Sequence, residues 1–155
     1  MRSKAVSSAP DNQDILDARH LLLPGTPNSL TPIREMVAAS AHKCGFDEGT
    51  IGQIEMAVDE ACSNIIEHGY MTQPLRLEIE VRCDSFANRL EVTIVDYSTV
   101  DFPIDEMPGI PVDDYLDAQR RRGLGLYIIR SFVDQVEHRF IGGQGNELRL
   151  VKYRA

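Results

Sequence analysis

The sequence contains no tryptophan, only three cysteines and no long apolar run. A membrane-spanning helix needs about 18 consecutive apolar residues, and no stretch approaches that length. The cysteines, Cys44, Cys62 and Cys83, are far apart, odd in number and free of any CxxC spacing. We therefore expect reduced, mostly buried thiols in a cytoplasmic protein, rather than disulfides or a cysteine-bound metal.

Positive charge is also scarce, because 16 Lys and Arg stand against 24 Asp and Glu, which leaves a net charge of −8. Nucleic acid and anionic membranes both repel such a chain, so neither is expected as a partner. Residues 1–10 lack the apolar segment of a secretory signal. With 155 residues, 43% hydrophobic and 26% charged, the chain has the composition of one folded domain.

Hydrophobic periodicity predicts a flexible N-terminal tail, residues 1–18, and one domain, residues 19–155. The predicted elements, in chain order, are a strand at 20–23, helices at 29–45 and 47–68, strands at 75–83 and 88–96, a helix after Gly123, and strands at 136–141 and 147–153. The first strand is expected to be covered on both faces, and Ser29 to cap the first helix. The second helix is expected to stop at Gly69. Its predicted buried stripe consists of Ile51, Ile54, Val58 and Ile65.

The stretch 97–122 has little periodicity and holds three prolines, so it is predicted to be a long loop, a feature that is usually functional in a small domain. The expected order is strand, two helices, two strands, loop, helix and two strands. Hairpins combined with helices on one side indicate an α+β two-layer sandwich. In this fold a mixed, mostly antiparallel sheet is covered on one face by helices.

Glu60 and Asn64 form the first candidate site, because four residues on a helix place both side chains on one face, about 40° apart. A carboxylate can accept a hydroxyl proton, and an amide oxygen is a suitable ligand for Mg²⁺. The pair lies off the apolar stripe, where it either lines a polar pocket or forms a solvated edge. His68, one turn further, either joins the same pocket or complements the helix dipole.

Asp96 is the second candidate, at the end of a predicted strand. Its carboxylate can accept a hydrogen bond from an exocyclic amine such as that of adenine, although acids at strand ends also begin turns. The third candidate is the segment 121–126, Arg-Arg-Gly-Leu-Gly-Leu, where small residues and a helix N-terminus favour an anion such as phosphate. No P-loop or GxSxG motif occurs. His20, His42 and His138 have no metal-ligand spacing.

The order and spacing of these three groups resemble the superfamily of gyrase, heat-shock chaperone and histidine-kinase ATPases. Within it, Asp59–Tyr70, Arg122–Arg130 and Gly145–Lys152 resemble the anti-sigma factor serine kinases, and the likeness covers residues 19–155. This resemblance implies the Bergerat-type ATP-binding fold, with ATP and Mg²⁺ as cofactors. It implies Glu60 as general base towards a serine hydroxyl and Asn64 as the Mg²⁺ ligand. The implied nucleotide contacts are Asn64, His68, Asp96, Ser98, Arg122, Gly123, Leu124, Gly125, Leu126 and Asn146.

The resemblance further implies a cytoplasmic, ATP-dependent serine/threonine kinase that binds a sigma factor and phosphorylates an anti-sigma-factor antagonist, and it is compatible with a homodimer. The chain departs from the family's Asp-x-Gly-x-Gly box, since it reads Asp96-Tyr97-Ser98-Thr99-Val100. Arg121 and Asn146 also replace a glycine and a threonine that are usual there. Two alternatives stay open: a non-catalytic regulatory binding module with weakened or lost ATP binding, and an ATPase or histidine-kinase-like domain separated from its usual partners.

Overall fold

The computed structural model describes residues 15–72, 77–97, 125–141 and 145–155. The strands are β1 (Ile15–Pro24), β2 (Glu78–Phe86), β3 (Arg89–Asp96), β4 (Gln135–Ile141) and β5 (Gly145–Tyr153). The helices are α1 (Leu30–Cys44), α2 (Glu48–Thr72) and the 3-10 helix η3 (Pro27–Ser29). Residues 125–132 are also helical.

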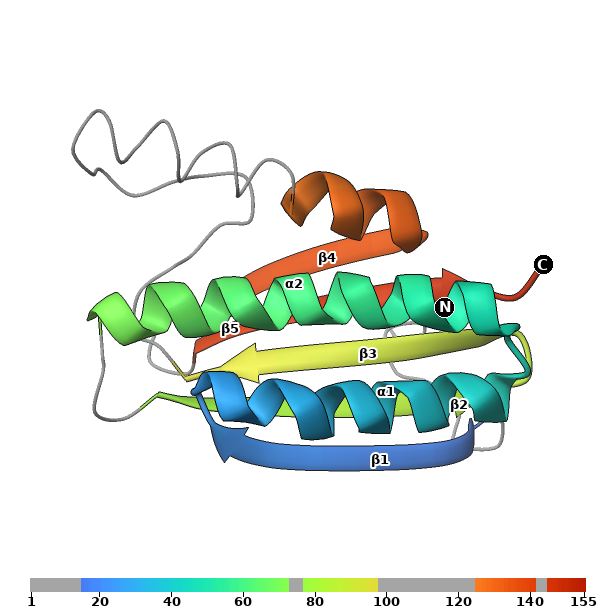
Figure 1. Ribbon diagram of the computed structural model, residues 1–155, viewed down its shortest axis with the longest axis horizontal. Coiled ribbons are helices and arrows are strands. Elements are labelled where there is room, and N and C mark those ends of the chain that lie inside the picture. The colour runs from blue at the N-terminus through green and yellow to red at the C-terminus, as the bar shows by residue number, and fades with distance from the viewer. Residues whose placement is uncertain (1–14, 73–76, 98–124, 142–144) are drawn as a thin grey trace, which may run out of the picture.

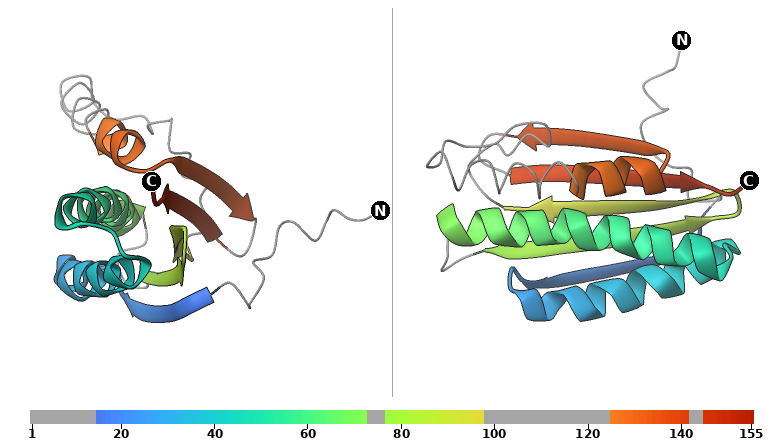
Figure 2. Two further views of the ribbon diagram at one scale, coloured as in Figure 1. Left: turned by 90° about the vertical axis from the view of Figure 1, so that its right-hand side faces the viewer. Right: turned by 45° about the horizontal axis from the view of Figure 1, so that its top comes forward.

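The strands form one sheet in the order β1-β2-β3-β5-β4, and each described pairing is antiparallel. The helices α1 and α2 lie side by side against one face of this sheet, and the helix at 125–132 lies beside α2 on the same side (Figures 1 and 2). The predicted α+β two-layer sandwich is therefore confirmed.

The core lies between the two layers. Alternate residues of β2 and β3 point into it, among them Ile79, Val81 and Ile94, which are fully buried. From the helices, the predicted stripe of α2 is confirmed: Ile51, Ile54 and Val58 are buried, and Ile65 packs against the core. Within the described ranges, none of the helices is long and apolar enough to cross a membrane.

β1 differs from its prediction in length and exposure. It begins at Ile15, ahead of the expected start of the domain, and it lies at the edge of the sheet. Half-buried and exposed residues alternate along it: Leu21 packs against the core, whereas Leu22 is 52% exposed. The prediction of two covered faces is therefore wrong, because the described helices lie on one side of the sheet.

The junction between α1 and α2 follows the sequence prediction. Gly45 ends α1 with a φ of 87°, a left-handed conformation that glycine adopts without strain. Asp47 then accepts a 2.8 Å hydrogen bond from the backbone N–H of Thr50 and so caps the start of α2. These local bonds turn the chain so that the two helices pack side by side.

Two predictions about helix ends are wrong. Ser29 makes no capping bond with its side chain, because its hydroxyl donates to the carbonyl of Pro24 at 2.6 Å and ties the helix to β1 instead. The helix α2 continues through Gly69 to Thr72. A glycine inside a helix costs about 1 kcal/mol relative to alanine, which weakens a helix without ending it.

The β2–β3 hairpin is confirmed, with tighter bounds than predicted. β2 extends to Phe86, which is fully buried, so the connection is shortened to Ala87 and Asn88. The alternation in the sequence stops at Cys83, but both following residues are buried: the hydroxyl of Ser85 donates to the carbonyl of Ser40 in α1 at 2.9 Å, and the guanidinium of Arg89 covers the ring of Phe86 at 3.8 Å. The turn brings Ser85 opposite Leu90.

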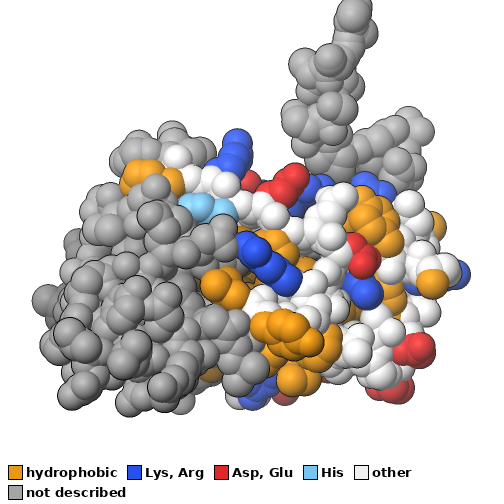
Figure 3. All heavy atoms as spheres, turned by 90° about the horizontal axis from the view of Figure 1, so that it is seen from above, with side chains coloured by type: hydrophobic (Ala, Val, Ile, Leu, Met, Phe, Trp, Pro, Cys, Tyr) orange, Lys and Arg blue, Asp and Glu red, His pale blue; other side chains and the backbone are white. Residues whose placement is uncertain are grey.

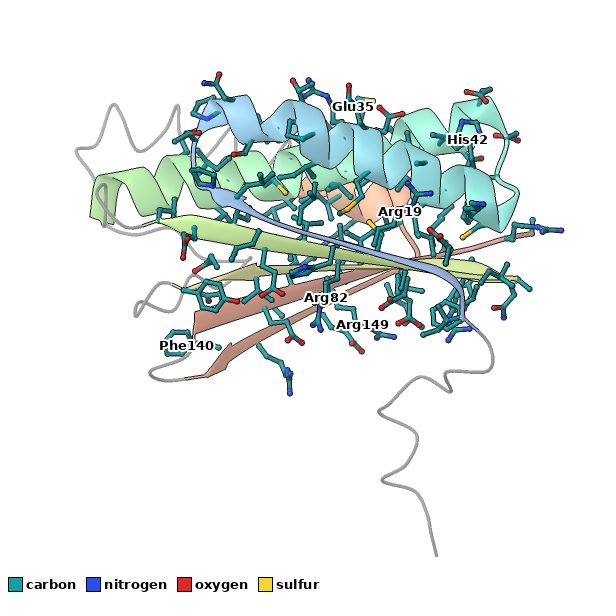
Figure 4. All side chains as sticks on the ribbon, turned by 90° about the horizontal axis from the view of Figure 1, so that it is seen from below. Arg19, Glu35, His42, Arg82, Phe140 and Arg149 are labelled. Carbon is teal, nitrogen blue, oxygen red and sulfur yellow. The ribbon has the colours of Figure 1, made fainter. Side chains whose placement is uncertain are left out.

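The sheet face opposite the helices carries charged side chains, among them Arg82 and Arg149 (Figure 4). Arg149 lies 3.1 Å from Glu91, and Arg89 pairs with the same carboxylate at 2.6 Å. Glu91 is only 6% exposed, so the two guanidinium groups compensate a nearly buried charge.

Several predictions fall outside the described residues. These are the tail over residues 1–14, the start of the expected strand at 75, the loop from residue 98 onwards, and the turn at 142–144. Of the expected site residues, Ser98, Arg122, Gly123 and Leu124 lie in that undescribed loop. His68 belongs to α2, but its side chain is also outside the description.

Candidate functional site

The described site residues come from elements that meet towards one end of the molecule. The C-terminal half of α2, the end of β3 and the start of β5 all reach this end, with the helix at 125–132 beside α2 (Figures 1 and 2). Seen from above, the described part of the surface presents hydrophobic, basic and acidic side chains intermixed (Figure 3).

Glu60 and Asn64 lie beside the third helix at Gly125, the first described residue of that helix. A Cβ atom added to Gly125 would lie 2.7 Å from Oε2 of Glu60 and 3.9 Å from Nδ2 of Asn64. The missing side chain therefore lets the helix backbone approach both polar groups closely. This contact joins the first and third groups of the sequence analysis.

The environment of Glu60 suits a general base. Burial raises the pKa of its carboxyl, and the neighbouring acids Asp59 and Glu67 raise it further. A raised pKa strengthens a carboxylate as a proton acceptor near neutral pH. Asp59 itself is engaged by α1, because Nη1 of Arg34 donates to its Oδ1 at 2.7 Å. The ion pair links the two helices next to the candidate base.

Asp96 is 1% exposed and therefore does not begin a solvated turn. The strand register places it directly opposite Asn146 of β5, and Nδ2 of Asn146 donates to Oδ1 of Asp96 across 3.3 Å. Both side chains project from the face of the sheet that carries Ile94 and Leu148, which is the face covered by the helices. A buried carboxylate and a buried amide thus lie together at the end of the core.

Gly145 permits the close approach of β5 to the end of β3. Its φ is 125°, and an added Cβ would lie 2.0 Å from the carbonyl oxygen of Asp96 and 2.9 Å from Cα of Tyr97. No other residue fits without moving one of these strands. The position of Asp96 thus depends on a glycine that the sequence analysis did not include among the site residues.

His138 is a further site residue that the sequence analysis did not select. Its Nε2 lies 2.9 Å from Oδ1 of Asn146, so β4 also reaches the carboxylate, through the amide. The sequence indicates the face of β4, because side chains alternate along a strand and His138 therefore shares a face with Val136 and not with Arg139. Metal-ligand spacing, the only property of His138 considered in the sequence analysis, does not reveal this face.

The remaining described candidate is Leu126, which is half-buried beside Gly125 in the third helix. Ile129, one turn further, is fully buried and packs this helix into the core. No contact of Leu126 with the polar groups is defined, so its predicted role in nucleotide binding stays a prediction. The structure thus brings together Glu60, Asn64 and Gly125, and separately Asp96 and Asn146.

Comparison with protein families matches residues 23–152 to the family described as histidine kinase-like ATPase domain. This match covers most of the chain, from the end of β1 to the end of β5, and includes every residue of the candidate site. The chain belongs to this family.

Among curated proteins, the chain is similar to enzymes named serine-protein kinase RsbW. The protein from Bacillus licheniformis is 30% identical over 117 residues, which is 73% of this chain and 72% of that protein. The protein from Bacillus subtilis is 28% identical over 147 residues, which is 92% of this chain and 88% of that protein.

Among solved structures, the chain resembles a crystal structure of the RsbU and RsbW domains of a Mycobacterium tuberculosis protein. The TM-score is 0.58 at 18% identity, and the match covers 88% of this chain. The chain spans 31% of the length of that larger protein. At this identity the likeness supports the fold alone, and it agrees with the two-layer sandwich described above.

Proposed function

We propose that this chain is an ATP-dependent serine/threonine protein kinase that acts as an anti-sigma factor and phosphorylates an anti-sigma-factor antagonist. The observation that carries the proposal is the contact of Gly125 with Glu60 and Asn64. It joins a proton acceptor, a hard amide ligand and closely approaching helix backbone, which are the groups that phosphoryl transfer requires. The similarity to serine-protein kinases named RsbW supports the choice of a protein substrate.

The residues present fit Mg·ATP. Asn64 would hold Mg²⁺ through its amide oxygen, and Asp96 would accept a hydrogen bond from the adenine amine. Gly125, with the undescribed residues Arg122 to Leu124 and with Leu126, would face the phosphates, because the missing Cβ leaves room at this helix. When bound, Mg·ATP supplies the phosphoryl group and the cation that screens its charge.

The work of the chain is then positioning and proton transfer. Glu60, whose pKa is raised by burial and by its acidic neighbours, would accept the proton of the substrate hydroxyl. Asp96 and Asn146, on the sheet, would orient the adenine ring of the nucleotide. His68 and Ser98 remain proposed nucleotide contacts. We further propose a cytoplasmic protein that binds a sigma factor as well as its antagonist and forms a homodimer.

One rival function is favoured by a specific observation. Ser98 and Val100 occupy the positions of the two glycines that follow the adenine-reading acid in related ATPases. A β-branched residue disfavours positive φ and close approach of a ligand. In this rival, the chain is a regulatory module that binds protein partners with weakened or lost ATP affinity.

Two measurements separate these functions. Calorimetric titration with ATP and Mg²⁺ should give saturable binding, and absence of binding would favour the rival. Incubation with Mg·ATP and the cognate antagonist should give phosphoserine or phosphothreonine, detected by mass spectrometry. E60Q should abolish the modification while it leaves ATP affinity within about threefold, because general base catalysis contributes about 10²- to 10⁴-fold. E55Q, on the same helix and outside the site, is the matched control and should behave as the unaltered protein.

A further inference from the structure

A chain of hydrogen bonds crosses three strands at the end of the core. Nε2 of His138 on β4 lies 2.9 Å from Oδ1 of Asn146 on β5, and Nδ2 of Asn146 lies 3.3 Å from Oδ1 of Asp96 on β3. The strands β4, β5 and β3 are consecutive neighbours in the sheet. The three side chains therefore form a row across the sheet, on the side that the helices cover.

The direction of the two hydrogen bonds, that is, which group donates and which accepts, follows from the chemistry of the row. A carboxylate only accepts hydrogen bonds, so the group of Asn146 that faces Asp96 must be its NH₂. The amide oxygen then faces His138, and since a carbonyl oxygen also only accepts, Nε2 of His138 must carry a hydrogen. Asp96 thus excludes the flipped orientation of Asn146, in which two acceptors would face each other, and His138 completes the row by donating from Nε2 to the amide oxygen.

The direction of these hydrogen bonds matters energetically because Asp96 and Asn146 are buried. Asp96 and Asn146 are 1% and 5% exposed, so water cannot readily replace a lost partner. The neighbouring residue of β4, Arg139, has the opposite direction and pairs with Glu147 on the outer face at 3.0 Å. The side chain of His138 therefore belongs to the row on the inner face, whereas that of Arg139 belongs to the outer face.

We propose that His138 is a positioning residue for purine selection. Through Asn146 it holds an acceptor, the carboxylate of Asp96, next to a donor, the amide nitrogen of Asn146. The edge of adenine presents an amine donor next to the acceptor N1, whereas guanine presents the acceptor O6 next to the donor N1–H. The row matches adenine and opposes guanine, because a buried site built for one hydrogen-bond pattern rejects the reverse. This inference rests on the proposed function, since it assigns the selectivity of the same nucleotide site.

The first test needs no nucleotide. Nitrogen-15 NMR of the full chain, recorded at pH 8.5, reports which ring nitrogen carries the hydrogen. The resonance of His138 is assigned by its loss in H138Q. The row requires the hydrogen on Nε2, and a hydrogen on Nδ1 would overturn the proposal whatever the protein binds.

The second test measures the affinities for Mg·ATP and Mg·GTP by calorimetry. H138A removes the donor and should lower the ratio of ATP to GTP affinity about three- to tenfold, the loss expected for one hydrogen bond. H138Q retains a donor and should keep the ratio within about twofold of the unaltered protein. R139Q, which breaks only the outer pair on the same strand, is the matched control and should leave the ratio unchanged.

The outcomes distinguish this inference from the proposed function. If the unaltered protein binds ATP but H138A leaves the ratio unchanged, even with both affinities weakened, His138 has only a structural role and the inference is overturned. If the unaltered protein binds neither nucleotide, the proposed function fails and purine selection fails with it. Should H138A not fold, H138Q and H138E form a pair of equal size. The glutamate cannot donate when ionised, so H138E should lower the ratio and H138Q should not.

Discussion

Replacement of Gly145 by alanine should destabilise the fold strongly. The backbone at this position has a φ of 125°, and an added Cβ would lie 2.0 Å from the carbonyl oxygen of Asp96. Forcing a residue with a side chain into such a conformation costs about 1 to 3 kcal/mol. Overlap with backbone that belongs to a paired strand costs about as much again. We therefore expect the free energy of unfolding to fall by about 2 to 5 kcal/mol, a large share of the total of about 5 to 15 kcal/mol for a domain.

Urea denaturation followed by circular dichroism measures this change, provided that the slope of unfolding free energy against urea stays constant. The matched control is G52A in α2, where an added Cβ would meet nothing within 4 Å. Alanine there should raise the free energy of unfolding by about 0.5 to 1 kcal/mol, because glycine is a poor helix former. A loss in G145A of less than about 0.5 kcal/mol would refute the close approach of β5 to Asp96.

Three further predictions concern the other half of the site and the cysteines. G125A should fold with little loss of stability, because the added Cβ meets the flexible end of the Glu60 side chain. The rate of phosphotransfer should fall at least about tenfold, because the carboxylate is displaced. Equal rates in G125A and the unaltered protein would contradict this prediction. The pKa of Glu60 is raised in the folded state, so its ionisation lowers the free energy of unfolding as the pH rises. E60Q should therefore be more stable than the unaltered protein at pH 7.5 and should lose this advantage near pH 4. Urea denaturation at the two pH values measures the difference. The thiols of Cys44, Cys62 and Cys83 are buried, and burial raises their pKa, that of Cys83 to about 12. A thiol reagent should therefore label them only after urea is added. Rapid labelling of the native protein would count against the fold.

The sequence was sufficient to predict the fold class and the order of its elements, because these depend on local periodicity. It also predicted the junction at Gly45 and Asp47, where the conformation follows from one glycine and one capping acid. Local rules failed where a distant contact decides the outcome. The hydroxyl of Ser29 binds the carbonyl of Pro24 rather than its own helix, and β1 has one exposed face because the described helices cover the sheet from one side (Figure 2).

The candidate site shows the same division. The spacing of Glu60 and Asn64 predicts a shared helix face, but their contact with Gly125 joins parts of the chain that only the packing of two helices brings together. Asp96 was ambiguous in the sequence, since an acid at a strand end is usually solvated. Its burial, and its hydrogen bond with Asn146, follow from the register of β3 on β5, which periodicity alone does not determine.

The two halves of the site are supported in different ways. Asp96 and Asn146 belong to paired strands, whose backbone hydrogen bonds and tight contact at Gly145 hold them in position before any ligand binds. Glu60 and Asn64 depend instead on how closely the helix at 125–132 packs against α2. In the proposed function, recognition of adenine is therefore preformed in the sheet, whereas the geometry for phosphoryl transfer depends on the packing of the helices. A partner protein that binds the helical layer could thus regulate transfer without abolishing nucleotide recognition, because the sheet would keep its register when the helices shift.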